Sequence, residues 1–335
     1  MRKRPILALA IIILSALATL AAAYFISPES IDAAGINGLL SGMANLGILK
    51  TFLLSLLIPS LLSTLSFCVL SAAGSVNLAV LGEILAGYFA ASRTLALLLP
   101  VAGDIAAVSV SLLAGAAAGA IFSLIPVIIK SILNINVTES GLLLSVSALF
   151  LSRYLLGNEG AGSAEGAALA DSDITAICIA AAAALLFTLT AAMLLKGKTG
   201  VKWRVASLGR KESAIKGISF AKALFSSSAV SGALCGLAGG VILLGIGNSV
   251  ASGATQSSAE CSLIALAAAA LAAFCPALST ALGLLLSALC FTAGMLLSSE
   301  AYGAIHIIIP ALALLAFAVL NHCGRRIASG KGAKE

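Results

Sequence analysis

The sequence predicts an all-α polytopic membrane protein with about ten transmembrane helices. Of its 335 residues, 61% are hydrophobic and only 10% are charged, and the mean hydropathy is +1.14. A soluble domain of this size cannot bury so much apolar surface. Several apolar runs also reach the roughly 18 residues that cross about 30 Å of hydrocarbon. Their continuity favours helices over the alternating strands of a membrane barrel.

The apolar runs are expected to form one transmembrane domain that covers residues 1–335. The ten expected spans are 6–26, 49–70, 77–92, 105–127, 140–156, 174–195, 222–246, 260–274, 277–297 and 304–322. The third and eighth are short, so each is either a full crossing or a re-entrant or broken segment. The first follows MRKRP and is longer than the apolar core of a signal peptide, although LATLAAA leaves cleavage open.

Lysine and arginine placement predicts the orientation, because cytoplasmic loops carry an excess of these residues. With a cytoplasmic N-terminus and ten crossings, 16 basic residues lie inside and three lie outside, namely Lys50, Arg93 and Arg153. The loop 157–173 has four acids and no base, which is typical of an external loop. Both termini are therefore predicted to be cytoplasmic. The net charge of +6 is attributed to membrane-flanking residues beside lipid, and no nucleic-acid partner is expected.

No motif in the chain predicts catalysis or a bound cofactor. The seven cysteines show no metal-ligand spacing, so neither a disulfide nor a metal site is expected. The phosphate-binding pattern GxxxxGK[ST] fails at residues 197–199, because Ala192 stands where the first glycine belongs. The chain is therefore not expected to be an enzyme.

Two polar residues interrupt the third apolar run, GSVNLAVLGEILAGYFA (74–90). Asn77 is expected to cap the start of a helix, since asparagine is a favoured N-cap residue. A charged side chain at the bilayer centre costs roughly 2.5–3.5 kcal/mol, so Glu83 is expected to face protein or water. On a helix Glu83 shares a face with Ala79, Gly87 and Ala90, which are small enough for a close neighbour. Glu83 then locks two helices together, lines a polar pathway or lies at an exposed helix end.

Other polar residues lie in the second and eighth spans. Glu260 is expected to begin the eighth span, with the same two alternatives as Glu83. Ser63, Thr64 and Ser66 are able to bond a ribose or a base, but hydroxyls in membrane helices more often bond their own backbone. Small residues spaced four apart, in Gly115–Gly119 and Gly232–Gly236–Gly240, favour close helix packing.

The longest internal polar segment is residues 196–222, with eight basic residues and one acid. Its apolar residues Val205, Leu208, Ile215 and Ile218 indicate either a short amphipathic helix beneath the membrane or an ordinary basic loop.

Five segments resemble, in order and spacing, permease subunits of ABC importers that carry nucleosides delivered by basic-membrane-protein (BMP-type) lipoproteins. The segments are GSVNLAVLGEILAGYFAA (74–91), IIKSILNINVTESGLLLSVSALFLSRYLL (128–156), WRVASLGRKESAIKGI (203–218), SGALCGLAGGVILLG (231–245) with SGATQSSAECSLIALAAAALAAFCP (252–276), and IIIPALALLAFAVL (307–320). The chain departs from the family where Leu81 replaces a glutamate, GRK (209–211) replaces NPE, and SAE (258–260) replaces a glycine–arginine–glycine pattern.

The resemblance implies the ABC importer permease fold in a bacterial cytoplasmic membrane, with purine nucleosides as the solute. It also implies that ATP is bound and hydrolysed by a separate ATPase, and that a second permease (as a heterodimer) and an external substrate-binding lipoprotein complete the importer. Segment 196–222 would then be the coupling segment that contacts the ATPase. The contacts are expected at Arg204, Gly209, Arg210, Lys211, Glu212 and Gly217. Gly217 is expected to end a helix there.

Two alternatives to a nucleoside permease remain open. Related ABC permeases for simple sugars or branched-chain amino acids share the helix order, and an aromatic content of 5% does not favour nucleosides. A stand-alone ion-coupled secondary transporter would require intramembrane charges in both halves and an inverted repeat. The residues expected to line a substrate pathway are Asn77, Glu83, Ser63 and Glu260.

Overall fold

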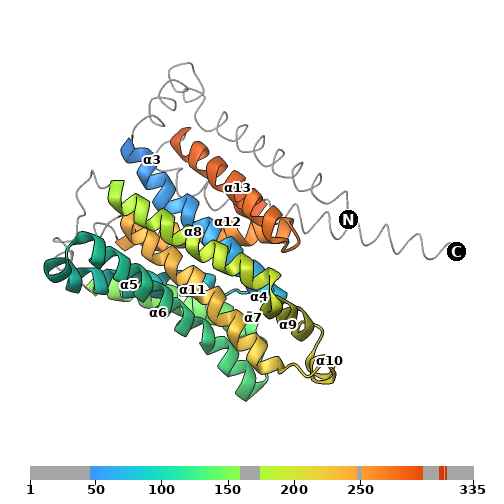
Figure 1. Ribbon diagram of the computed structural model, residues 1–335. Helices are drawn as coiled ribbons and strands as arrows, with labels where there is room; N and C mark the ends of the chain where they lie inside the picture. The colour runs from blue at the N-terminus through green and yellow to red at the C-terminus, as the bar shows by residue number, and fades with distance from the viewer. Residues whose placement is uncertain (1–45, 159–173, 247–250, 297–308, 313, 315–335) are drawn as a thin grey trace, which may run out of the picture.

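The computed structural model describes residues 46–158, 174–246, 251–296, 309–312 and 314, and these form helices joined by short connections, without a strand among them (Figure 1). The first and last expected spans, the acidic loop 157–173 and both termini lie wholly or mostly outside the described residues. The all-α prediction is confirmed for the described part of the chain.

Eight long helical segments occupy the eight inner expected spans. They are a continuous segment of α3 (Leu46–Phe52), the π-helical turn η2 (Leu53–Leu57) and α4 (Ile58–Ala72), followed by α5 (Val80–Ala102), α6 (Asp104–Leu133), α7 (Val137–Asn158), α8 (Ile174–Lys196), α11 (Phe220–Ile246), α12 (Ala251–Leu271) and α13 (Pro276–Leu296). Among the described residues, five helices are long and apolar enough to cross a membrane. Two shorter apolar helices cover Val137–Ser152 and Pro276–Thr292.

The expected bounds of the third and eighth spans are wrong, because both helices continue through polar residues. Helix α5 runs on past Arg93, whose side chain is exposed, and the Thr94 hydroxyl donates to the Ala90 carbonyl of its own helix. Helix α12 begins at Ala251, nine residues before the expected start, and the Ser258 hydroxyl donates to the carbonyl of Ala254. The two helices have 23 and 21 residues, and α5 is one of the five that are long and apolar enough to cross a membrane.

A proline explains the π-helical turn η2. Pro59 has no backbone N–H and its ring crowds the carbonyl four residues earlier, so a regular α-helix cannot continue through this position. The chain widens instead, and the Ile58 N–H donates to the carbonyl of Leu53, five residues back. The Ser55 carbonyl accepts a bond from the Cys261 thiol of α12 at 3.4 Å. The irregular turn is thus satisfied by a neighbouring helix.

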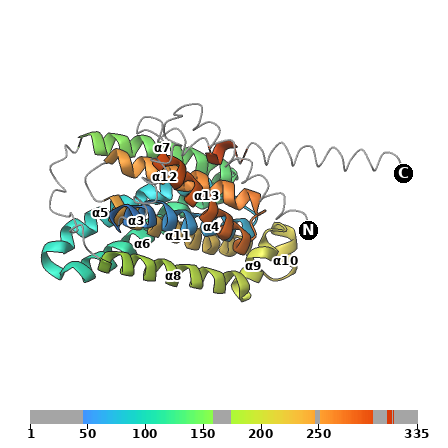
Figure 2. The same ribbon diagram turned by 90° about the horizontal axis from the view of Figure 1, so that it is seen from above.

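Helix α11 lies at the centre of the bundle, between α8 on one side and α5 and α6 on the other, and it also contacts α4 and α12 (Figures 1 and 2). Its glycines meet the backbone of its neighbours directly. A Cβ atom added at Gly236 would overlap the carbonyl oxygen of Gly115, and one added at Gly87 would overlap that of Gly236. One added at Gly239 would overlap the carbonyl oxygen of Ile84. The close packing predicted from the spaced glycines is confirmed.

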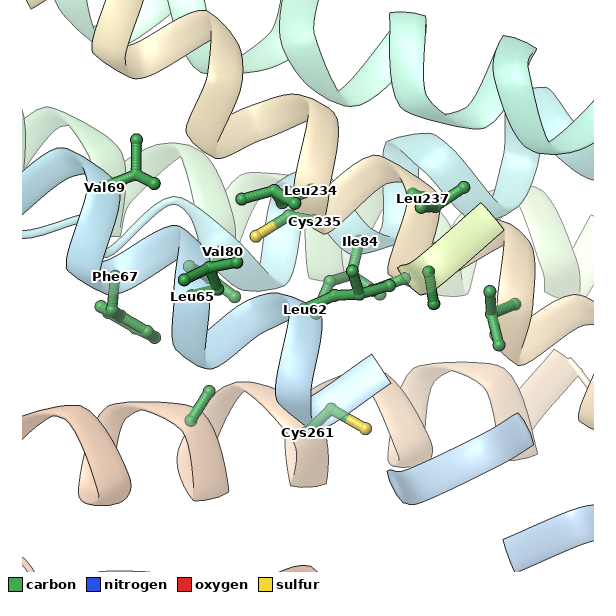
Figure 3. Close-up of a cluster of buried hydrophobic side chains, with 14 of the residues drawn as sticks. Leu62, Leu65, Phe67, Val69, Val80, Ile84, Leu234, Cys235, Leu237 and Cys261 are labelled. Atoms are coloured by element: carbon green, nitrogen blue, oxygen red, sulfur yellow. The ribbon is translucent and has the colours of Figure 1, made fainter. Parts of the chain in front are cut away.

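Apolar side chains of α4, α5 and α11 fill the space between these three helices (Figure 3). Leu62 and Leu65 of α4 lie opposite Leu234 of α11, with Val80 and Ile84 of α5 beside them, and all five are buried. The exposed large apolar side chains lie mainly on α6, α7 and α8. These outer faces suit a hydrocarbon surrounding, because a helix satisfies its own backbone polar groups.

Two glycines on one helix give a direct test of the backbone packing. Gly236→Ala places a methyl group against the Gly115 carbonyl, whereas Gly240→Ala meets the movable end of the Leu112 side chain at 3.0 Å. Overpacking typically costs about 1–3 kcal/mol, so we expect Gly236→Ala to lower the unfolding temperature in detergent clearly more than Gly240→Ala. Equal losses would contradict backbone contact at Gly236.

Candidate functional site

The chain breaks between α4 and α5, and residues 73–79 are not helical. Within this break, Asn77 has a relative exposure of 2% and its side-chain amide donates to Ser66 Oγ of α4 at 3.2 Å. Ser66 lies almost two helical turns before the end of α4, a depth of about 9 Å at 1.5 Å per residue. The break therefore turns back into the bundle, and α5 begins well inside it.

Polar groups of α7 satisfy the backbone of the break. Thr138 Oγ1 donates to the Val76 carbonyl at 3.3 Å, and Ser145 Oγ donates to the Leu78 carbonyl at 2.8 Å. The Gly82 N–H in turn donates to Ser145 Oγ at 3.3 Å. Non-helical backbone at membrane depth is tolerated only where protein or a water-filled cavity meets its polar groups. Helix α7 provides that protein environment here.

Four buried side chains form a hydrogen-bonded cluster, which we name the polar network: Ser66 of α4, Asn77 of the break, Glu83 of α5 and Ser231 of α11. The Asn77 amide donates to Glu83 Oε2 at 2.9 Å and to Ser231 Oγ at 2.8 Å. The hydroxyls of Ser66 and Ser231 lie 2.7 Å apart. All four residues are at most 2% exposed, so the polar network is closed in this conformation.

The prediction that Asn77 is the N-cap of α5 is wrong. The N-cap position is Ala79, and no side chain caps the first turn. Asn77 Oδ1 instead accepts the N–H of Ala79 at 3.0 Å, a local turn that fixes the side chain. This bond leaves the amide hydrogens of Asn77 free to point toward Glu83 and Ser231. The tendency of asparagine to bond nearby backbone is therefore present here, but it orients the Asn77 amide toward the polar network and does not cap α5.

Ser63 and Cys235 lie at the edge of the polar network. The Cys235 thiol of α11 is beside Glu83, Ser66 and Ser63. Ser63 Oγ is buried and has no nitrogen or oxygen partner among the described residues. Thr64 follows the expectation for membrane helices, because its hydroxyl donates to the Ser60 carbonyl of its own helix at 2.6 Å.

The prediction that Glu260 begins the eighth span is wrong, because Glu260 lies in the middle of α12. Its side chain is 4% exposed, and Gln256 Nε2 donates to Glu260 Oε1 at 2.9 Å. The prediction failed because Gln256 and the serines beside it continue the helix. Glu260 therefore belongs to a polar pair on α12, while the polar network is built from α4, α5 and α11.

The basic segment 196–222 forms a second candidate site at one end of the bundle (Figures 1 and 2). It folds as two short helices, α9 (Lys198–Ala206) and α10 (Arg210–Ile215), which we name together the α9–α10 unit. Neither of the two alternatives, one short amphipathic helix or an ordinary basic loop, describes the segment, since the chain breaks at Gly209 and leaves Leu208 58% and Ile215 86% exposed. Gly217 does end α10: it has φ +67°, and the Ile218 N–H reaches back to the Ser213 carbonyl at 2.9 Å.

Side chains anchor the α9–α10 unit to the membrane helices. Trp203 is buried and its indole N–H donates to Ser226 Oγ of α11 at 2.9 Å. Arg204 donates to the Leu195 carbonyl in the last turn of α8 at 2.7 Å, so this predicted coupling residue holds two helices together. Lys130 of α6 and Arg210 both lie over the ring of Phe220, at 5.4 and 5.6 Å from its centre.

The remaining predicted coupling residues lie on the surface of the α9–α10 unit. Arg210, Lys211, Glu212 and Gly217 are exposed, and Gly209 is half-buried. Ile215 of helix α10 is also exposed, so this surface carries basic side chains and at least one apolar one. Trp203 and Ser231 were not predicted as site residues: the single tryptophan in a basic segment was the available signal for the first, and no local signal marks the second.

Neither a metal nor a disulfide is indicated in the described part of the chain. It contains no group of three or more histidine, cysteine or acidic side chains placed to hold a metal ion. The six cysteines it includes are all free thiols, and Cys323 lies outside it. The chemistry of the two candidate sites is therefore that of hydrogen bonding and charge.

Comparison with protein families identifies the chain. The family model described as the permease component of a branched-chain amino acid transport system matches residues 48–320. The chain belongs to this permease family. No curated protein and no solved structure matches the permease. The match covers all the described helices from α4 to α13, so both candidate sites lie inside the family region.

Membership of this family shows the general role of the chain. The permease is the membrane component of an ABC transport system, and such a component works with an ATPase and a substrate-binding protein. The resemblance noted in the sequence is thus confirmed at the level of ABC permeases.

A double-mutant cycle tests the Asn77–Glu83 bond. We expect Asn77→Ala and Glu83→Ala each to lower stability by about 1–3 kcal/mol, because each leaves a buried polar partner unpaired. The double variant should lose clearly less than the sum, since residues in one network couple by about 0.5–3 kcal/mol. Thermal unfolding in detergent measures all three variants.

Asn136 and Glu139 provide the matched control for this cycle. They make the same type of bond at 2.9 Å, but at an exposed position. Their alanine variants should be additive and nearly without effect. Additive losses at Asn77 and Glu83 would show that the polar network is not a coupled unit.

Proposed function

We propose that the permease imports a neutral solute rich in hydroxyl groups, with purine nucleosides as the first candidate. The observation that supports this is the polar network: an amide, a carboxyl group and two hydroxyls gathered inside an apolar bundle at a helix break. Broken helices of membrane transporters are where substrates bind, because their irregular backbone and polar side chains line a cavity. Here the same elements meet around Asn77.

The proposed role requires the polar network to open during transport. Its groups now bond one another, and a buried donor or acceptor left without a partner costs about 1–3 kcal/mol. A solute with several hydroxyls is able to replace these bonds one for one, so opening around such a solute leaves no group unpaired. Ser63 Oγ, which has no nitrogen or oxygen partner among the described residues, adds a further hydroxyl beside this route.

Simple sugars are the second candidate, because their hydroxyls meet the same groups. A branched-chain amino acid fits less well. Its carboxylate would approach Glu83, the buried acid of the polar network, and its aliphatic side chain replaces none of the hydrogen bonds there. Like charges repel strongly where little water is present. This argument places branched-chain amino acids below the two hydroxyl-rich classes.

The partners and orientation complete the proposal. We assign the α9–α10 unit as the surface that docks on the ATPase, which binds and hydrolyses ATP in place of this chain. A second permease is proposed as the partner of a heterodimer, and the substrate-binding protein is proposed to be an external lipoprotein.

The end of the bundle with the α9–α10 unit carries Lys130, Lys196, Lys222 and the basic residues between the last two. By the positive-inside rule this end is cytoplasmic, in a bacterial cytoplasmic membrane with both termini inside.

Glu83→Gln tests the pathway role. Glutamine keeps the shape and still accepts a bond from Asn77, so the importer should assemble normally. We expect uptake of labelled guanosine to fall about tenfold, equivalent to about 1.4 kcal/mol, while Glu139→Gln at an exposed site leaves it unchanged. Unlabelled ribose and leucine added as competitors rank the solutes. Unaltered uptake by Glu83→Gln would remove Glu83 from the pathway.

Charge reversal tests the docking surface. In Arg210→Glu with Lys211→Glu, two exposed bases become acids, and mismatched charge across an interface costs several kcal/mol. We expect the ATPase that copurifies with the tagged permease to fall at least about tenfold. Lys50→Glu on α3, at the opposite end of the bundle, is the control. If the ATPase stays bound and uptake stays coupled in the reversed variant, this surface does not dock it.

A further inference from the structure

We infer that Ser207 and Gly74 form the contact through which the α9–α10 unit moves the polar network. The inference rests on the proposed function, because it assigns a path from the ATPase-docking surface to the proposed substrate route. It makes Ser207 and Gly74 positioning residues, which act on the solute only through Asn77.

The contact between Ser207 and Gly74 is too tight to absorb movement. Ser207 is the C-cap of α9, and Gly74 begins the turn back into the bundle. A Cβ atom added at Gly74 would lie 2.9 Å from Ser207 Cα and 3.0 Å from Ser207 Cβ. Gly74 also has φ +84°, which side-chain-bearing residues rarely adopt. The Gly74 backbone therefore packs against both the backbone and the Cβ atom of Ser207, and a shift of α9 toward Gly74 must displace the break.

Displacement of the break acts directly on Asn77, three residues further along. The start of the break is fastened to α4, since the Gly74 N–H donates to the Ser71 carbonyl at 2.9 Å and the Ser75 N–H to the Leu70 carbonyl at 3.4 Å. Asn77 is the member of the polar network that bonds the other three. It is also its one member outside a regular helix, so it is the member that can move without bending a helix.

Trp203 connects α9 to the polar network by a second route. Its bond to Ser226 fastens α9 to α11, the helix that also carries Ser231 of the polar network. Helix α9 and Ser231 therefore move together as one body. A shift of this body relative to α4 therefore acts on the polar network at two points: at Gly74, which leads to Asn77, and at Ser231, which bonds Asn77 and Ser66. Displacement at either point breaks bonds of the polar network and opens it.

Reactivity of Cys235 reports this opening, because its buried thiol lies beside Glu83 and Ser66. The experiment uses the assembled importer, with Cys235 as the only cysteine of this chain, and a small methanethiosulfonate reagent. We expect ATP with vanadate to speed labelling of Cys235 by at least about fivefold, a coupling of about 1 kcal/mol. Ser207→Gly, which removes the side chain at the contact, should reduce this acceleration to less than about half while the ATPase stays bound.

Gly74→Ala provides the opposite perturbation, and Gly103→Ala is its matched control. Both glycines have positive φ, +84° and +72°, so alanine is strained at both, but a Cβ atom at Gly103 meets nothing within 4 Å. Gly74→Ala should speed labelling about fivefold without ATP, and Gly103→Ala should not. The inference is overturned if the two glycine variants behave alike, or if Ser207→Gly keeps the full response to ATP. If Gly74→Ala fails to fold, the response of Ser207→Gly to ATP still decides whether the inference holds.

The proposed function fails in a different way. If no ATPase binds the permease, or if uptake proceeds without ATP, the docking role is wrong and the inference falls with it. If the ATPase binds and drives uptake while Ser207→Gly and Gly74→Ala leave Cys235 labelling unchanged, only the inference is lost.

Discussion

Direct backbone contact between α11 and its neighbours is the constraint on which the rest of the structure depends. Glycines on α5, α6 and α11 bring three helices close enough that no side chain fits between them at the crossing points. In lipid, where apolar side chains gain little by association, close van der Waals packing and hydrogen bonds hold helices together. The Ser123 and Ser228 hydroxyls add such bonds, because each donates to the carbonyl of the other residue, at 2.8 and 2.6 Å.

The polar network follows from this packing. Since α11 lies so close to α4 and α5, Ser231 reaches Ser66 and Asn77, and the four side chains of the polar network bond one another. Such a buried network specifies one arrangement when it is fully satisfied, and it is costly when partly satisfied. The same property suits a transport pathway. Closed, the network locks three helices; opened, it presents an amide, a carboxyl group and hydroxyls to a solute.

The sequence predicts the helices and the close packing, because hydrophobic runs and spaced glycines are local features. It fails where a residue's role is set by distant partners. Asn77 has the local preferences of a helix cap, but its orientation serves Ser231, which is 154 residues away. Two helices were predicted too short because Arg93 and Gln256 are polar. Polarity alone does not show that a side chain faces outward or bonds its own helix. Arg204 is exposed, as its assignment to a partner surface requires, but nothing in the sequence indicates that it also joins α8 and α9.

The most direct test of this account is ATP-dependent uptake by proteoliposomes that contain the purified permease with its copurifying subunits. The account predicts that labelled guanosine accumulates only when ATP and the ATPase are on the side of the α9–α10 unit, and that a substrate-binding protein is required on the opposite side. It is contradicted if the chain alone carries the solute down an ion gradient without ATP. That result would make the polar network part of an ion-coupled transporter.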